Sequence, residues 1–235
     1  MRGWDVAGLV TIRVTADDSM MFQVPTTALA GMQAAGADLP WLPIPINGDE
    51  DAEMDILQSA LENIVNGSQK PRSETWSKQE MSDAVWPDGW DWPSNLRRLR
   101  SSDPIQGLVV GAIRSDYQKT RIEQMCSRLN IKSFTPLWHH GGGAHMRDLV
   151  SHGHQIMITS VTSDGLDEKW VGRILSQSDV VELEELSLKH RFNVDGEGGE
   201  FETAVLNAPW MKFPIKTQHT IHWTCLLYTS DAADE

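Results

Sequence analysis

An apolar run leads directly into a polar segment in Gly107-Leu108-Val109-Val110-Gly111-Ala112-Ile113-Arg114-Ser115-Asp116-Tyr117-Gln118. The run from 107 to 113 has the length and apolar character of a buried strand. Ser115 and Gln118 have the spacing of a capping box, which predicts that a helix begins directly after the strand. Apolar residues then recur at helical spacing and predict the buried face of that helix: Ile122, Met125, Cys126 and Leu129.

The same alternation of strand and helix extends along much of the chain. Further strands are predicted at 6–12, 41–46, 134–138 and 155–161, and further helices at 26–35, 49–65, 144–151 and 178–189. Such alternation is typical of a parallel sheet covered on both faces, with ligands bound beyond the carboxyl ends of the strands. We therefore expect an α/β fold, with a Rossmann-like parallel sheet in residues 1–138.

The amino-acid composition changes towards the end of the chain. Glycine and glutamate become frequent after residue 192, and an alternating apolar segment follows them. This pattern predicts a second, smaller α+β lobe in residues 139–224. Residues 225–235 show no pattern continuous with the rest, and we interpret them as a non-native tail.

Charge and composition exclude several functional classes. The 235 residues include 20 Lys and Arg against 33 Asp and Glu, for a net charge of −13. An acidic chain has no general attraction for nucleic acid or for anionic membranes, so neither partner is expected. The cysteines number two, Cys126 and Cys225, and the sequence contains no long apolar run. These features predict a cytoplasmic protein with reduced thiols.

A segment rich in tryptophan, residues 71–103, separates the second predicted helix from the strand at 107. It is too polar and too broken for a regular element, and we interpret it as a surface insertion. Its tryptophans either fix a long loop to the body of the protein or form a patch for a partner, and the first interpretation is favoured on general grounds. These tryptophans are Trp76, Trp86, Trp90 and Trp92.

Three glycines and three carboxylates lie within eight residues in Gly196-Glu197-Gly198-Gly199-Glu200-Phe201-Glu202-Thr203. Glycines permit positive φ angles and close approach of a ligand to the backbone. Clustered carboxylates can hold a hard cation, bind ammonium or remove a proton. The alternative is a turn at Asp195-Gly196 with solvated glutamates that lead into a strand.

Two further segments carry candidate ligand groups. The helix start at 111–118 offers free backbone N–H groups that can receive a phosphate, although an ordinary capped helix explains the same residues. Five histidines surround the glycines at 141–143, but no cysteine is near enough to complete a recognised zinc pattern. We therefore favour a surface role over a metal site for His139, His140, His145, His152 and His154.

Several motifs, taken in order, resemble those of the diphthine–ammonia ligase family, in its archaeal form, within the N-type ATP pyrophosphatases. The resemblance runs from about residue 6 to about residue 212, and the glycine-glutamate motif is its most specific part. It rests on Gly111 to Gln118, Arg121-Ile122-Glu123, Cys126 to Leu129, Pro136 to Trp138, Gly165 to Glu168, Gly172-Arg173, Gly196 to Thr203 and Asn207 to Pro209.

The resemblance implies a reaction. Diphthine on translation elongation factor 2 would be adenylated at its carboxylate by ATP, and ammonia would then displace AMP to give diphthamide. Magnesium would neutralise the pyrophosphate. The partners implied are therefore ATP, magnesium, ammonium and the elongation factor.

The resemblance also implies roles for particular residues. Glu197, Glu200 and Glu202 would hold ammonium and deprotonate it, or bind magnesium, with Glu200 as the candidate metal ligand, and these roles are not separated. Residues implied near the adenosine are Thr11, Ser19, Gly111, Ala112, Ile113, Ser115 and Asp116. Residues implied to contact the substrate are Gly196, Gly198, Gly199, Tyr117 and Arg121.

The chain departs from the family pattern at its beginning. Family members begin with a strand and a Ser-Gly-Gly-Lys-Asp-Ser type phosphate loop, and this sequence contains neither, while Gln23 stands where histidine is usual. We interpret the chain as a fragment that is itself inactive. The alternative is a non-catalytic nucleotide-binding or protein-interaction module that lacks the phosphate loop. An ATP pyrophosphatase that modifies transfer RNA is disfavoured by the acidic charge and the missing zinc-type cysteines.

Overall fold

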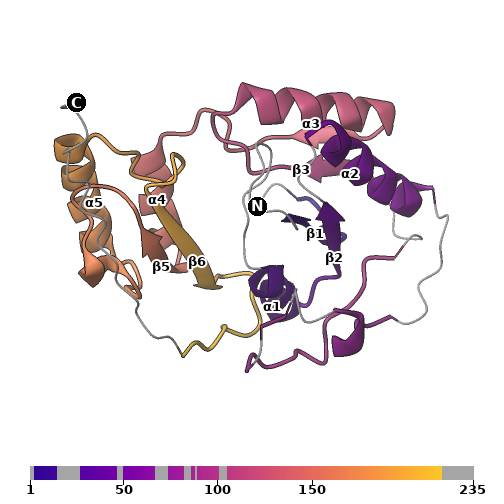
Figure 1. The fold of residues 1–235 in the computed structure, drawn as a ribbon, viewed down its shortest axis with the longest axis horizontal. Coiled ribbons are helices and arrows are strands. Elements are labelled where there is room, and N and C mark those ends of the chain that lie inside the picture. Colours follow the sequence, from indigo (N-terminus) through magenta and orange to yellow (C-terminus); the bar gives the residue numbers. More distant parts are fainter. Residues whose placement is uncertain are drawn as a thin grey trace, which may run out of the picture.

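The computed structural model describes residues 3–14, 27–46, 50–66, 74–81, 86–87, 89–100 and 105–218. Its elements form two groups that lie side by side (Figure 1). The first group contains β1 (Leu9–Val14), α1 (Thr27–Ala37), β2 (Trp41–Ile46), α2 (Glu50–Val65), β3 (Gly107–Val109), α3 (Asp116–Arg128) and β4 (Lys132–Phe134). The second contains α4 (Gly142–Ser151), β5 (Gln155–Val161), α5 (Gln177–His190) and β6 (Phe201–Asn207). Short 3₁₀ turns lie at Lys78–Glu80 and Glu168–Trp170.

The described strands pair as three two-stranded sheets. β1 pairs in parallel with β2, from Leu9 opposite Trp41 to Val14 opposite Ile46. β3 pairs in parallel with β4, and β5 pairs antiparallel to β6. The fold is therefore mixed α/β, and a single Rossmann-like sheet stays a prediction.

The first group has helices on both faces of its strands. Along β2, Ile44 and Ile46 pack into one core with α2 and α3, whereas Trp41 packs with α1 on the opposite face. This alternation follows from the two-residue period of a strand, which sends successive side chains to opposite faces. The predicted buried face of α3 is confirmed, since each of its members is buried: Ile122, Met125, Cys126 and Leu129.

Tryptophans of the insertion pack against the first group. Trp86 is 2% exposed and belongs to the cluster around Trp41, where Trp76 and Trp92 also pack. The indole Nε1 of Trp76 donates a hydrogen bond to the carbonyl of Trp41 at 3.1 Å. Trp90 differs, with 38% of its surface exposed. The described part of the insertion thus supports the interpretation that its tryptophans fix the loop to the body.

The β5–β6 sheet is covered on two sides. One face packs against α4 and α5 in a cluster that includes Ile158, Val180 and Leu183. The other face contributes Met157, Ala204 and Leu206 to a second cluster, where Leu29 of α1 packs. The side chain of Gln33 in α1 also donates a hydrogen bond to the carbonyl of Val205 at 2.9 Å. α1 therefore joins the two groups of elements.

Three of the predicted strands differ from the structure, and the first of them, predicted at 6–12, is β1 at Leu9–Val14. β3 ends at Val109, so the residues from 110 to 115 form a connection to α3. The prediction of a strand at 134–138 is wrong, because β4 ends at Phe134 and a turn follows, closed by a hydrogen bond from the Trp138 amide to the Thr135 carbonyl at 3.2 Å. Pro136 has no amide hydrogen with which to extend the ladder.

Some predictions fall outside the described residues. These are the adenosine contact at Ser19, the substitution at Gln23 and the tail at 225–235. Within the described ranges, no helix is both long enough and apolar enough to cross a membrane.

Candidate functional site

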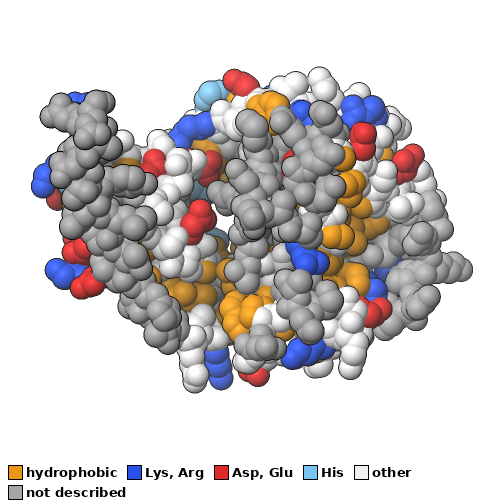
Figure 2. All heavy atoms as spheres, viewed as in Figure 1, with side chains coloured by type: hydrophobic (Ala, Val, Ile, Leu, Met, Phe, Trp, Pro, Cys, Tyr) orange, Lys and Arg blue, Asp and Glu red, His pale blue; other side chains and the backbone are white. Residues whose placement is uncertain are grey.

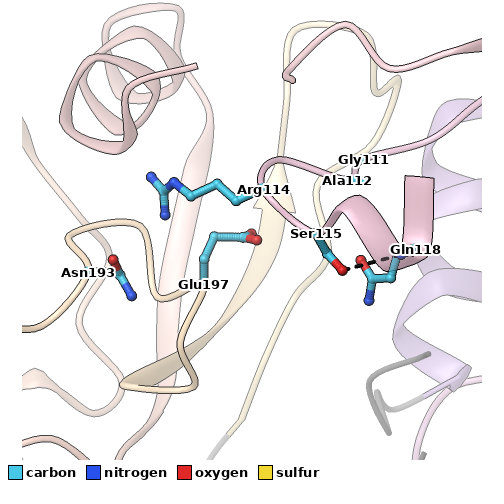
Figure 3. Close-up of a pocket in the computed structure, with 7 residues that line it drawn as sticks. All are labelled: Gly111, Ala112, Arg114, Ser115, Gln118, Asn193 and Glu197. Carbon is cyan, nitrogen blue, oxygen red and sulfur yellow. Dashed lines mark hydrogen bonds between the residues drawn. The ribbon is translucent and has the colours of Figure 1, made fainter. Parts of the chain in front are cut away.

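A cleft of about 480 Å³ lies where the two groups of elements meet. Figure 3 shows its lining in close-up, and Figure 2 shows that charged side chains are spread over this face of the molecule. One wall comes from the connection into α3 and the other from the loop before β6. The lining residues are Gly111, Ala112, Arg114, Ser115, Gln118, Asn193 and Glu197.

The first wall is a short connection held at both ends. Ser115 caps α3, because its hydroxyl accepts a hydrogen bond from the Gln118 amide at 3.3 Å, which confirms the predicted helix start. The carbonyl of Ile113 accepts a hydrogen bond from the His139 amide at 2.9 Å. Gly111 leaves open space where a side chain would lie. This wall therefore presents backbone and small side chains to the cleft between the longer side chains of Arg114 and Gln118.

The second wall is a glycine-rich loop closed on itself by Glu200. One carboxylate oxygen of Glu200 accepts hydrogen bonds from the backbone and the side-chain amide of Asn193, each at 2.8 Å. The other oxygen accepts a hydrogen bond from the Gly198 amide, also at 2.8 Å. Partial burial opposes ionisation, but these hydrogen bonds outweigh it and lower the pKa of Glu200. Glu200 thus holds the loop together, and the catalytic role predicted for it stays a prediction.

Glycine is required in this loop by its backbone conformation. Gly196 has a φ of +74°, and a side chain there would lie 2.8 Å from the Phe201 carbonyl oxygen. Gly199 has a φ of +82°. Residues with side chains rarely adopt such angles, so the two glycines allow the loop to turn back into β6.

Glu197 is the carboxylate of this loop that faces the cleft. Its side chain projects towards the wall that carries Ser115 (Figure 3). Desolvation by the surrounding protein raises the pKa of Glu197, and the Asp195 and Glu200 carboxylates raise it further, whereas Arg114 lowers it. A carboxylate with increased proton affinity in a cleft is typical of a group that exchanges protons with a ligand.

An ion pair connects the two walls behind Glu197. Both terminal nitrogens of Arg114 donate hydrogen bonds to the Asp195 carboxylate, at 3.2 and 2.7 Å. The Asp195 side chain is 2% exposed, whereas that of Arg114 is 40% exposed. A side chain at Gly142, the first residue of α4, would lie 2.5 Å from an Asp195 oxygen, so only glycine fits there.

Sequence reasoning did not identify Arg114, Asp195 or Asn193 as members of the site. Arg114 lies inside the stretch that predicts the third strand and helix, and Asp195 directly precedes the glycine-glutamate motif. The opposite charges of Arg114 and Asp195, each in or beside a motif of one proposed site, were the signal that could have indicated an ion pair.

Other predicted site residues lie outside the cleft lining. Glu202 is an exposed residue of β6, and Asp116 is exposed in the first turn of α3. Arg121 donates a hydrogen bond to the Tyr117 hydroxyl at 2.9 Å on the surface of α3. The Thr11 hydroxyl accepts a hydrogen bond from the Trp41 indole at 3.0 Å. The roles of these residues stay predictions.

The magnesium role predicted for Glu200 stays a prediction. Both of its oxygens already accept hydrogen bonds from the loop, which competes with a metal ion for the same lone pairs. In the described ranges, no three His, Cys, Asp or Glu side chains form a group that could hold a metal ion.

The rings of His140 and His145 lie 5.7 Å apart, and burial is the main factor that lowers the pKa of His145.

Comparison with known proteins places this loop within a defined family domain. Residues 142–228 match the diphthamide synthase C-terminal domain. The resemblance to the diphthine–ammonia ligase family is confirmed. The matched range includes the whole glycine-rich loop and its three glutamates, whereas the wall at 111–118 precedes it.

Individual diphthine–ammonia ligases match about half of the chain. The protein from Homo sapiens is 40% identical over 121 residues, which cover 51% of this chain and 45% of the relative. The protein from Danio rerio is 34% identical over 131 residues, which cover 54% of this chain and 51% of the relative. The protein from Saccharomyces cerevisiae is 33% identical over 133 residues, which cover 50% of this chain and 19% of the relative. The chain thus spans about half, or less, of the length of these relatives.

Proposed function

We propose that the cleft takes part in the ATP-dependent amidation of diphthine on translation elongation factor 2, which gives diphthamide. The observation that carries this proposal is the position of Glu197, a carboxylate with a raised pKa that faces the cleft from the glycine-rich loop. The relatives are named diphthine–ammonia ligases, and this name gives the proposed substrate class.

The proposed reaction has two steps because a free carboxylate is a poor acyl donor. In the first, a carboxylate oxygen of diphthine attacks the α-phosphorus of ATP, and the bond to pyrophosphate breaks. In the second, the nitrogen of ammonia attacks the activated carbonyl carbon, and the carbon–oxygen bond to AMP breaks. Ammonium must lose one proton before its nitrogen can attack. The nitrogen loses a second proton after the C–N bond has formed, so this step needs a base.

Glu197 is the residue that fits this base. The charge of Asp195 is balanced by its ion pair with Arg114, which leaves Glu197 as an additional negative charge at the cleft. A negative charge in a partly desolvated cleft attracts ammonium and holds it by hydrogen bonds. The raised pKa of Glu197 makes its carboxylate a stronger proton acceptor than an ordinary glutamate.

The other proposed roles follow from position. Apart from Arg114, the wall from Gly111 to Ser115 presents small side chains and the start of α3, which suits close approach of the adenylate. Glu200 and the glycines at 196, 198 and 199 shape the loop that presents Glu197. Tyr117 and Arg121 lie on the neighbouring surface of α3, where they would contact the elongation factor. Magnesium would be bound together with the pyrophosphate, and no step is assigned to it.

Release of AMP tests the proposal. With ATP, ammonium chloride and elongation factor 2 that carries diphthine, we expect AMP and diphthamide to form in equal amounts. Omitting ammonium, or supplying the factor without diphthine, should reduce amide formation to background. If the longest natural open reading frame containing this sequence binds ATP but forms no diphthamide, the activity is contradicted and the non-catalytic nucleotide-binding module is favoured.

A further inference from the structure

We propose that Arg114 and Asp195 are positioning residues, whose ion pair holds the glycine-rich loop at a fixed place across the cleft and balances the charge beside Glu197. The inference deepens the proposed function and rests on the role of Glu197 in it. Its test uses no substrate, so its outcome is independent of the outcome for AMP release.

The glycine-rich loop is internally fixed. Glu200 holds Asn193 and Gly198 through three hydrogen bonds. Backbone hydrogen bonds add to this, from the Gly196 amide to the Asn193 carbonyl at 3.0 Å and from the Gly199 amide to the Gly196 carbonyl at 2.9 Å. These contacts all lie within residues 193–200, so they fix the shape of the loop without fixing its distance from the opposite wall.

The ion pair supplies a contact that crosses the cleft. Asp195 belongs to the loop, two residues before Glu197, whereas Arg114 directly precedes the cap of α3. The guanidinium forms a two-point contact with the carboxylate, which restricts orientation as well as distance. Since the loop keeps its own shape, fixing Asp195 fixes Glu197 relative to Ser115.

The Asp195 carboxylate depends on Arg114 because it is buried. Its side chain is 2% exposed and lies against Gly142 at the start of α4. A buried carboxylate needs a charged or hydrogen-bonding partner, because desolvation strongly disfavours an unpaired charge. The start of α4 contains no acidic residue of its own, so Asp195 also supplies a negative charge near that helix terminus. Three segments are thus joined at one carboxylate.

The same pair determines the charge that Glu197 experiences. The charged groups that face Glu197 are Asp195 and Glu200 from its own loop and Arg114 from the opposite wall. Asp195 favours protonation of Glu197 and Arg114 opposes it, so the two members of the pair act in opposite directions.

Carbon-detected NMR titration of the Glu197 carboxyl group tests the proposal in the protein without ligand. The resonance is assigned by its absence from Glu197→Gln. We expect Arg114→Gln to raise the pKa of Glu197 and Asp195→Asn to lower it. The matched control is Arg173→Gln, which removes a comparable arginine–aspartate pair, at 3.1 Å from Asp179, away from the cleft. The control should leave the titration of Glu197 unchanged.

A conservative variant keeps the test valid if Arg114→Gln fails to fold. Arg114→Lys retains the positive charge beside Asp195 but replaces the two-point contact with a single ammonium. We expect the Glu197 titration to stay near that of the parent protein, while residual dipolar couplings show the amides of 193–200 reoriented together relative to α3. The proposal is overturned if Arg114→Gln and Asp195→Asn shift Glu197 in the same direction or not at all, if Arg173→Gln shifts it equally, or if Arg114→Lys leaves the loop orientation unchanged.

Discussion

Glu200 and Asn193 close the glycine-rich loop, because one oxygen of Glu200 accepts hydrogen bonds from both the backbone and the side-chain amide of Asn193, each at 2.8 Å. This contact separates the three glutamates of the motif by role. Glu200 is used in holding the loop, Glu202 lies exposed on β6, and Glu197 faces the cleft. The predictions below depend on that division.

Removing the charge of Glu200 should destabilise the protein. In Glu200→Gln the oxygen that accepts from Gly198 or Asn193 becomes an amide nitrogen, which cannot accept those hydrogen bonds. Hydrogen bonds to charged groups contribute about 1.5–3 kcal/mol each when well formed, and the partial exposure of this site reduces that, so we expect a loss of about 1–2 kcal/mol. Urea denaturation measures it. Glu202→Gln is the matched control and should change stability by less than about 0.5 kcal/mol.

The contribution of Glu200 should depend on pH in a defined direction. Its pKa is lower in the folded protein than the ordinary value of 4.5, so the folded state favours the ionised form. Stability from this group is therefore complete above that ordinary value and is lost as the pH falls through the folded-state pKa. The difference in unfolding free energy between the parent protein and Glu200→Gln should shrink on acidification. A difference that grows below pH 4 would contradict the assignment.

Glu197 should show the opposite dependence. Its pKa is raised above the ordinary value of 4.5, so the folded state disfavours the ionised form. Near neutral pH the charged side chain therefore destabilises the fold, and Glu197→Gln should increase stability by up to about 0.5 kcal/mol, as expected for an exposed position. That gain should disappear at pH values below the ordinary value. Thermal unfolding at pH 4 and pH 7 makes the comparison, and a loss of stability at pH 7 would argue against it.

The buried tryptophan of the insertion should matter far more than the exposed one. Trp86 packs among α1, Trp41 and Leu96, so Trp86→Ala should leave a cavity and reduce stability by about 3–5 kcal/mol. Trp90 is 38% exposed, and Trp90→Ala should change stability by about 0.5 kcal/mol or less. Chemical denaturation of the two variants compares them. Equal effects would mean that the insertion is not fixed through Trp86.

Local patterns predicted the elements well because their signals are local. The apolar spacing of α3 and its Ser115 cap both lie within a few residues, and the structure has them as predicted. The strand predicted at 134–138 was wrong because the apolar side chains there belong to a turn, which Pro136 favours by removing a backbone donor. Strand pairing is set by contacts between distant residues, and this is why the sequence did not determine how the strands divide into sheets.

The sequence predicted which residue types the candidate site contains, but not which position each residue takes in it. The density of glycine and glutamate at 196–203 marked the loop, yet nothing in that pattern distinguishes Glu200, which accepts from its own loop, from Glu197, which faces the cleft. That distinction depends on the direction of each side chain after the turn at Gly196. The Arg114–Asp195 contact depends on packing between the two groups of elements, which no local pattern encodes.

The most direct test of the central claim is the rate of ammonium-dependent diphthamide formation by Glu197→Gln, compared with Glu185→Gln, in the longest natural open reading frame that contains this sequence. Loss of a positioned acid or base reduces turnover by about 10²–10⁴. We predict a reduction of that size for Glu197→Gln, without loss of folded protein. Glu185 is an exposed glutamate of α5, and we predict a change of less than about threefold for Glu185→Gln. Parent-like turnover by Glu197→Gln at saturating ammonium and at low ammonium would contradict the account.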